Sequence, residues 1–248
     1  MTELAIIGGT GLTTLKNLEI TRREVVHTPF GEPSGPLTHG ILSGKDVVFL
    51  ARHGYGHTIP PHKINYRANI WALHNTGVKK VIAVAAVGGI ADDLVPGTLA
   101  IPDQIIDYTA ARENTFFADG LSHVTHIDFT EPYCEELRQV LIRACTLTKL
   151  DFVPHGTYAT TEGPRLETAA EVERMARDGC TLVGMTGMPE AALARELELC
   201  YATCAVVANK AAGRGTGPIT MHEIEQTVTQ GMEKVRMLLE NVVPLLGD

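Results

Sequence analysis

The chain has 248 residues, of which 44% are hydrophobic and 20% are charged. This balance is typical of an ordinary folded protein and is too apolar for an intrinsically disordered one. The 29 acidic residues outnumber the 21 basic ones and give a net charge of -8, which excludes a non-specific nucleic-acid binder, because such proteins gain most of their affinity by neutralising phosphates.

Short apolar, β-branched runs alternate with longer helical patterns, which predicts an α/β fold with a covered sheet and crossover helices. The expected strands are residues 4–7, 47–50, 81–87, 98–106, 156–160, 181–185 and 204–208. The expected helices are residues 65–75, 132–149, 168–178, 189–199 and 220–246. Thr168 with Glu171, and Thr220 with Glu223, have the spacing of a capping box. Pro244 should perturb only the final turn of the last helix.

The sequence contains no internal repeat, low-complexity tract or linker, so we expect a single domain over residues 1–248, although the length alone also permits two small ones. The chain begins Met-Thr-Glu-Leu without a basic leader, and no apolar run is long enough to span a bilayer. The five cysteines are odd in number and form no C-x-x-C pair, which argues against a disulfide framework and a structural zinc site. These features predict a cytoplasmic protein with no membrane or nucleic-acid partner.

Polar turns follow several of the predicted strands, where α/β sheets bind ligands. The first is IIGGTGL, whose glycines let the backbone approach an anion and whose Thr10 adds a hydroxyl; alone, it is either a small anion loop or a plain tight turn. The second contains Arg52 and His53, and a guanidinium fork suits a tetrahedral oxyanion. A metal site of His53, His57 and His62 is the alternative, but glycines and prolines prevent helical spacing and no carboxylate accompanies the histidines.

Three further turns carry polar groups. They are residues 157–168, which include Glu167, the turn that holds Met185 and Thr186, and Asn209 directly after a buried strand. Each turn taken alone is more often structural than functional, because loop charges are usually solvated and a methionine is usually core. Asn209 must still find a partner, in the backbone or in a ligand. Five such turns in one chain favour a small-molecule enzyme.

The five turns together resemble the trimeric purine nucleoside phosphorylase family, and its methylthioadenosine phosphorylase branch in particular. The resemblance rests on IIGGTGL, TPFGEPS, LARHGYGHTIPPHKINYRANIWAL, the turn at residues 85–89, THIDFTEPYC, TEGPR and GMTGMPE. It implies a nucleoside phosphorylase fold with a mixed central sheet flanked by helices. It also implies phosphorolysis of a purine nucleoside, with inorganic phosphate as co-substrate and with no metal and no organic cofactor.

The resemblance assigns roles to individual residues. The phosphate-binding groups are expected to be Thr10, Arg52, His53, the backbone at Ala86, and Thr186. The nucleoside is expected to contact Met185 at the ribose and, around the base, Val87, Gly88, Leu166, Asn209, Lys210 and Ala211. Asn209 is the expected catalytic residue, because a hydrogen bond at N7 helps the purine to leave. In the family, the segment that holds His126 comes from a neighbouring subunit, which implies a homotrimer whose sites are completed by that subunit.

The sequence departs from the methylthioadenosine branch in the base pocket. That branch has aspartates at the positions of Asn209 and Ala211, and a small hydroxyl residue at the position of Glu167. A 6-oxopurine offers an acceptor at C6 and an N1–H donor, so Asn209 can donate to O6 and ionised Glu167 can accept from N1–H. Facing adenine, Glu167 would meet the bare N1 acceptor, and such mismatches discriminate strongly. We therefore expect hypoxanthine as the base.

The 5′ group of the substrate depends on the start of the last predicted helix. Family members that bind a 5′-hydroxyl use a histidine there, whereas the methylthio branch has an apolar residue, and either Met221 or His222 falls at this position. The two residues are about 100° apart around a helix, so only one should face the pocket. Met221 continues the apolar stripe with Ile224, and we favour it. The expected reaction is phosphorolysis of methylthioinosine to hypoxanthine and 5-methylthioribose 1-phosphate.

The sequence is also compatible with other functions. Within the family they are cleavage of methylthioadenosine and cleavage of inosine or guanosine. A catalytically silent nucleoside-binding module is a third possibility, although a binder has no need of phosphate ligands. A dehydrogenase would require a third glycine where Thr14 stands.

Overall fold

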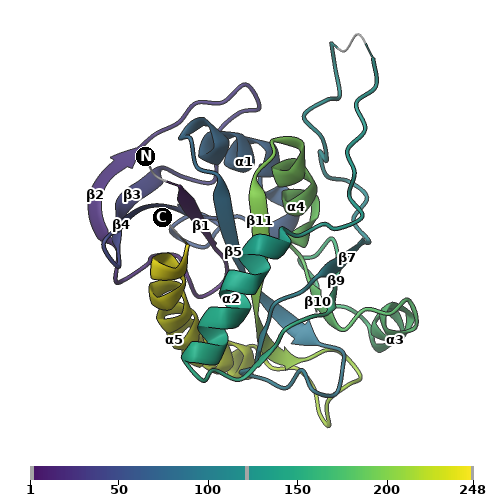
Figure 1. Cartoon of the computed structure of the whole chain (residues 1–248). Helices are drawn as coiled ribbons and strands as arrows, with labels where there is room; N and C mark the ends of the chain where they lie inside the picture. Colours follow the sequence, from purple (N-terminus) through teal and green to yellow (C-terminus); the bar gives the residue numbers. More distant parts are fainter. Residues whose placement is uncertain (1–2, 121–122, 247–248) are drawn as a thin grey trace.

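A mixed β-sheet runs through the centre of the protein in a computed structural model that describes residues 3–120 and 123–246 (Figure 1). Within these residues it has eleven strands. The continuous path is β2 (Glu19–Glu24), β3 (Leu37–Leu42), β4 (Lys45–Ala51), β1 (Leu4–Gly8), β5 (Lys80–Gly89), β10 (Leu182–Gly184), β9 (Thr157–Thr160) and β7 (Gln104–Asp107). The other strands are β11 (Cys200–Lys210), which pairs with β5, and β6 (Leu99–Ala100) and β8 (Phe152–Val153), which extend from β11. The predicted α/β class with a mixed sheet is confirmed.

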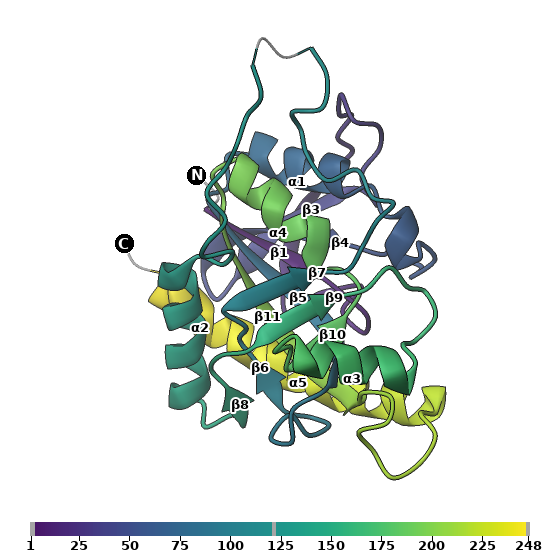
Figure 2. The same cartoon turned by 90° about the vertical axis from the view of Figure 1, so that its right-hand side faces the viewer.

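Helices cover both faces of this sheet. Figure 2 shows α1 (Tyr66–Asn75) and α4 (Gly187–Glu196) on one face, and α2 (Glu135–Leu147) and α5 (Met221–Leu245) on the other. A loop after β9 leads to α3 (Ala169–Arg177), and a short 3₁₀ helix spans Pro61–Lys63. None of the helices formed by the described residues is both long and apolar enough to cross a membrane.

The chain forms these elements for local reasons that its sequence shows. In β5, residues on both faces are buried, which suits its continuous apolar run. Thr168 makes a complete capping box with Glu171 at the start of α3. At α5, the Thr220 hydroxyl accepts a hydrogen bond from the Glu223 backbone, but the Glu223 carboxylate accepts from the Thr220 hydroxyl, so only half of the predicted box forms.

The strand predicted at residues 98–106 is wrong as a single element, because it divides into β6 and β7. Pro102, between them, has no N–H to offer to a sheet. At this break, Arg138 of α2 donates hydrogen bonds to the carbonyls of Pro102 (2.9 Å) and Ile101 (3.3 Å). Strands β2, β3 and β8 were not predicted. All but one of the residues of β2 are exposed, so it lacks the apolar signal of a buried strand.

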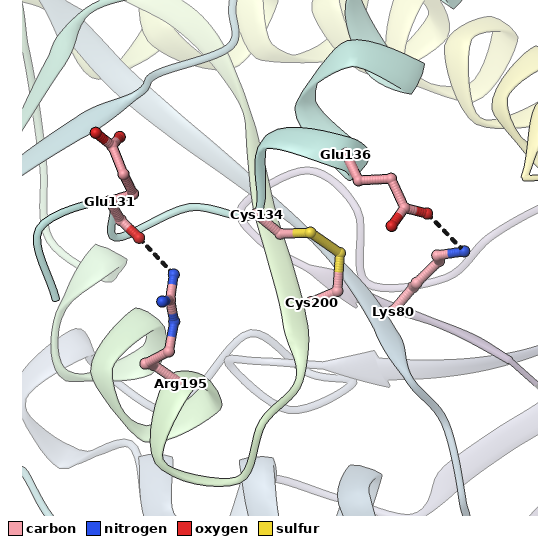
Figure 3. Close-up of a disulfide and its surroundings, with 6 residues drawn as sticks. All are labelled: Lys80, Glu131, Cys134, Glu136, Arg195 and Cys200. Atoms are coloured by element: carbon pink, nitrogen blue, oxygen red, sulfur yellow. Dashed lines mark hydrogen bonds and ion pairs between the residues drawn. A yellow bond between two sulfur atoms is a disulfide. The ribbon is translucent and has the colours of Figure 1, made fainter. Parts of the chain in front are cut away.

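The cysteines also differ from the prediction, which argued against a disulfide framework. Cys134 and Cys200 form a disulfide across 66 residues of sequence (Figure 3), while Cys145, Cys180 and Cys204 are free and buried. The pair joins the N-cap of α2 to the first residue of β11, and the Cys134 backbone N–H donates to the Tyr201 carbonyl at 2.8 Å. Tertiary packing brings the two cysteines together, so neither the number nor the spacing of the cysteines could predict the pair.

Candidate active site

A break in strand pairing along β5 forms the site. The β11 strand pairs along one edge of β5 from Lys80 to Gly89. On the other edge, β1 pairs parallel as far as Ala83, and β10 pairs antiparallel at Gly88 and Gly89. Between these two partners, residues 84–87 have no neighbouring strand on that edge in the described structure. The carboxyl ends of β1 and β10 therefore point towards the same gap, which is where ligands bind in α/β sheets.

A cavity of about 410 Å³ lies at this gap. Five strand ends contribute to its lining: residues 9–10 after β1, 52–53 after β4, 85–88 of β5, 183–186 at the end of β10, and 208–209 of β11. The lining also includes Leu166, Glu167, Met221 at the start of α5, and residues 57–61 after β4. The volume is in the range of roughly 300–1,000 Å³ that small-molecule sites occupy.

Arg52 lines the cavity and is only 1% exposed. Its Nε and Nη2 donate to the two carboxylate oxygens of Glu190 at 2.6 and 2.7 Å, and its Nη1 donates to the Val84 carbonyl at 2.8 Å. Burial lowers the pKa of the Arg52 guanidinium, but the charge and hydrogen bonds of Glu190 outweigh it and hold the pKa above its ordinary value. Arg52 therefore stays charged, and two of its five N–H groups have no partner among the described residues.

His53 is neutral at physiological pH. Its Nδ1 lies 2.8 Å from the Ile59 carbonyl, which can only accept, so Nδ1 carries the proton. Burial, and then the neighbouring charge of Arg52, lower the pKa of His53 to about 4. Its Nε2 is consequently a bare acceptor. Towards phosphate, the ring can accept a hydrogen bond from a protonated oxygen.

Three further groups that were predicted to bind phosphate line the same cavity: Thr10, Ala86 and Thr186. Thr186 is the N-cap residue of α4, and its hydroxyl caps none of the helix N–H groups. The Val84 carbonyl faces the gap, where Arg52 donates to it. Backbone groups two residues apart in a strand face the same edge, so the Ala86 N–H faces the gap as well. Beside Thr10, a Cβ at Gly9 would come within 2.4 Å of the Val84 carbonyl, so only glycine fits there.

A β-bulge in β11 places Asn209 in the cavity. The pairing of β11 with β5 shifts between Val207 and Asn209, which leaves Ala208 as the extra residue. The Asn209 Nδ2 donates to the Lys210 carbonyl at 2.7 Å. Its second N–H and its Oδ1 make no hydrogen bond with the described residues. Asn209 can therefore both donate to a ligand and accept from it.

Glu167 lines the cavity from the loop before α3. The Thr161 hydroxyl donates to its Oε1 at 2.6 Å, while Oε2 accepts no hydrogen bond from the described residues. The lining of the same cavity also includes apolar groups: Val87, Gly88, Leu166, Met185 and Ala211. The cavity thus offers one carboxylate oxygen that has no hydrogen-bond donor among the described residues.

Met221 and Ile224 of α5 line the cavity, and His222 does not. The His222 Nε2 lies 2.9 Å from the Gln226 amide, on the exposed face of the helix. The two alternatives that the sequence left at this position therefore lie on different sides of α5, and the apolar one faces the cavity.

A model of the phosphorylase superfamily matches residues 3–244. The chain belongs to this superfamily. The family that the sequence motifs predicted is therefore confirmed.

Known phosphorylases resemble this chain over nearly its whole length. A probable S-methyl-5′-thioinosine phosphorylase of Pseudomonas syringae pv. tomato is 54% identical over 243 residues, which are 98% of this chain and 99% of the relative. A 6-oxopurine nucleoside phosphorylase of Pyrococcus furiosus is 48% identical over 252 residues, with 99% and 94% coverage. The solved methylthioadenosine phosphorylase of Schistosoma mansoni in complex with adenine has a TM-score of 0.95 at 33% identity and covers 100% of this chain and 92% of its own.

Two residues that the sequence assigned to the phosphorylase site lie outside this cavity. Lys210 donates through Nζ to the carbonyls of Ala91 and Asp92 at 2.9 Å, so its charge supports a turn. His126 is exposed on the connection between β7 and α2, which projects from the body of the molecule in both views (Figures 1 and 2). His126 does not line the cavity.

Two buried charged residues of the phosphorylase were not among the predicted site residues. Glu190, which holds Arg52, lies at the start of the helix predicted over residues 189–199 and was given no role there. Arg112 donates to the carbonyls of Met185 and Met188 at 2.7 and 2.6 Å, on either side of Thr186. The one signal for Glu190 in the sequence is a carboxylate within the apolar stretch GMPEAALA, since such a residue must find a cation when it is buried.

Proposed function

We propose that this protein is a purine nucleoside phosphorylase that cleaves S-methyl-5′-thioinosine with inorganic phosphate. The products are hypoxanthine and 5-methylthioribose 1-phosphate. One observation carries the proposal: a single cavity joins the buried donors Arg52 and Thr186 to Asn209 and Glu167, which match a 6-oxopurine. The relatives support it, since one is named for methylthioinosine and another for 6-oxopurine nucleosides.

In the proposed reaction, a phosphate oxygen attacks the anomeric carbon as its bond to N9 breaks. The bonding electrons pass to the purine, which takes up a proton at N7, and this proton balances the one that hydrogen phosphate loses when its oxygen bonds to carbon. The N–H groups of Arg52, the Thr186 hydroxyl and the Ala86 amide hold the phosphate in line, and its negative charge stabilises the oxocarbenium-like sugar. These steps need no metal and no organic cofactor, because phosphate itself is the second substrate. Asn209 accepts from N7–H as the base leaves and donates to O6.

Glu167 supplies the selectivity for the base. Its Oε2 is available to accept from N1–H of hypoxanthine, and Thr161 holds the other oxygen. Adenine has no N1–H, so its binding would leave this carboxylate without a donor. Methylthioadenosine cleavage is the second candidate, because the Schistosoma mansoni structure shares the fold with adenine bound.

The 5′ end of the cavity favours a methylthio group over a hydroxyl. Met221 and Ile224 offer no hydrogen bond to a hydroxyl, and His222 faces elsewhere. Burying an unpaired hydroxyl costs roughly 1–3 kcal/mol in proteins. Inosine is therefore a poorer substrate in this proposal.

We also propose that the enzyme is a homotrimer. Leu166 and Met221 line the cavity and are 41% and 62% exposed, so the nucleoside end is open to solvent in one subunit. The projecting connection that carries His126 would cover this opening on a neighbour. Sedimentation analysis gives the mass of the assembly, and His126→Ala should raise the KM for the nucleoside while leaving that mass unchanged. A dimer or monomer that is fully active would contradict this assembly.

Cytoplasmic location stays a prediction. It depended partly on unpaired cysteines, and the disulfide removes that argument, since such bonds persist mainly in oxidising compartments.

The proposed reaction is tested by product analysis with purified enzyme. Methylthioinosine incubated with phosphate should release hypoxanthine and an equal amount of sugar phosphate, and without phosphate it should release neither. Hypoxanthine released with no phosphate would indicate a hydrolase. No release under either condition, together with nucleoside binding, would indicate a binding module.

A further inference from the structure

Glu190 is a carboxylate in the interior of the protein. It lies on α4 and has no exposed surface. A buried carboxylate is strongly unfavourable unless cations and hydrogen-bond donors satisfy it. Glu190 has three such donors: Arg52 Nε, Arg52 Nη2 and the Tyr201 hydroxyl, which donates to its Oε1 at 2.8 Å. This cluster is more than a generic ion pair, because one of its members lines the cavity.

The cluster fixes the direction of the Arg52 guanidinium. The group is planar, and Glu190 and the Val84 carbonyl together hold three of its five N–H groups. Once the plane is set, the directions of the two remaining N–H groups are fixed as well. A free arginine side chain would have to lose several rotamers before it could hold an anion in place.

Tyr201 anchors the other side of Glu190. It is 2% exposed, and its ring stacks on that of Tyr133 with centroids 6.2 Å apart. Its backbone is held by the Cys134 N–H, next to the disulfide drawn in Figure 3. Burial, and then the charge of Glu190, raise the pKa of the Tyr201 phenol well above its ordinary value, so it stays a donor.

We propose that Glu190 and Tyr201 are positioning residues that orient Arg52 for phosphate and so set the affinity of the enzyme for its co-substrate. Neither residue lines the cavity, and both act through Arg52. The inference rests on the proposed function. It predicts a result that a merely structural role would not produce: substitution of Glu190 or Tyr201 changes the KM for phosphate but not the KM for the nucleoside.

The test compares Glu190→Gln, Tyr201→Phe and the matched control Tyr133→Phe. In Glu190→Gln, the new side-chain amide would set an N–H₂ against the N–H groups of Arg52, so the KM for phosphate should rise at least about tenfold. Tyr201→Phe removes one donor to Glu190 and should raise it about threefold to fivefold. The Tyr133 hydroxyl is buried with no hydrogen-bond partner in the described structure, so Tyr133→Phe should leave both KM values unchanged.

A second background shows whether Glu190 acts through Arg52. In Arg52→Ala, the further change Glu190→Gln should not raise the KM for phosphate again. Calorimetric titration of inorganic phosphate into each protein, without nucleoside, should give dissociation constants in the same order as the KM values for phosphate. Wild-type turnover of methylthioinosine that requires phosphate is measured first, and its failure would contradict the proposed function rather than this inference. If the wild type passes and Tyr201→Phe binds phosphate like the wild type, or both KM values rise together, the positioning role is wrong.

Discussion

The two ends of the cavity are built differently. At the phosphate end, Arg52, His53 and Thr186 are at most 8% exposed, and the fold already satisfies much of the hydrogen bonding of Arg52 and His53. At the nucleoside end, Leu166 and Met221 lie in a loop and a helix start and remain exposed. In the proposed function, the sheet therefore binds the anion, whereas the choice of nucleoside depends, besides Asn209 of β11, on a loop and a helix start that can change without disturbing the core.

Arg52→Ala should have the largest effect, because it acts on the buried end. It removes a phosphate donor, which should lower kcat/KM for phosphate by about 2.7–4 kcal/mol in activation free energy. It also leaves Glu190 as an unpaired buried charge, which should reduce the free energy of unfolding by about 3–5 kcal/mol. Steady-state kinetics and urea denaturation measure the two effects. Unchanged dependence on phosphate would remove this end of the cavity from the reaction.

Asn209→Asp should damage the opposite end without loss of stability. The carboxylate faces O6 as acceptor against acceptor, so methylthioinosine cleavage should lose about 2–3 kcal/mol. Adding Glu167→Ser removes the conflict with the bare N1 of adenine. The double variant should therefore cleave methylthioadenosine better than either single variant, and the two changes should be non-additive in a double-mutant cycle. Additive effects would show that the two residues do not read the same base.

The choice of 5′ group should be a smaller effect. We expect methylthioinosine to exceed inosine in kcat/KM by at least about tenfold, because the Met221 side offers no partner to a hydroxyl. Met221→His should narrow this ratio. Equal efficiency on the two nucleosides in the wild type would show that a polar group, from this chain or a neighbour, reaches the 5′ position.

The pH dependence of His53 concerns only the buried end, and its effect on stability should be absent at neutral pH. Its pKa is about 4 in the folded protein against 6.5 when exposed, so the unfolded state binds more protons between these values. The stability that depends on neutral His53 is thus complete above pH 6.5 and is lost as the pH falls towards 4. Titration of the ring Cε1–H signal by NMR measures this pKa. A midpoint near 6.5 would mean that the ring is solvated.

The sequence predicted the parts of the site that lie at strand ends, and it missed the parts that support them. Thr10, Arg52 and Asn209 follow apolar strands, so a local pattern places them at one edge of a sheet. Nothing local pairs Arg52 with Glu190, because 138 residues separate them and only packing of α4 on the sheet brings them together.

The same reasoning explains the other differences. The disulfide depends on a tertiary contact, and β2 is exposed at the edge of the sheet. The Lys210 side chain donates to a loop whose position cannot be predicted from the spacing of residues in the sequence.

The most direct test of the account is the ratio of kcat/KM for methylthioinosine to that for methylthioadenosine in the wild-type enzyme, at one saturating phosphate concentration. Glu167 and Asn209 both favour the 6-oxopurine, and each mismatched polar contact is worth about 1–3 kcal/mol, so the ratio should exceed about thirty. A ratio near one would contradict the account, because it would show that the carboxylate at Glu167 does not read N1 of the base.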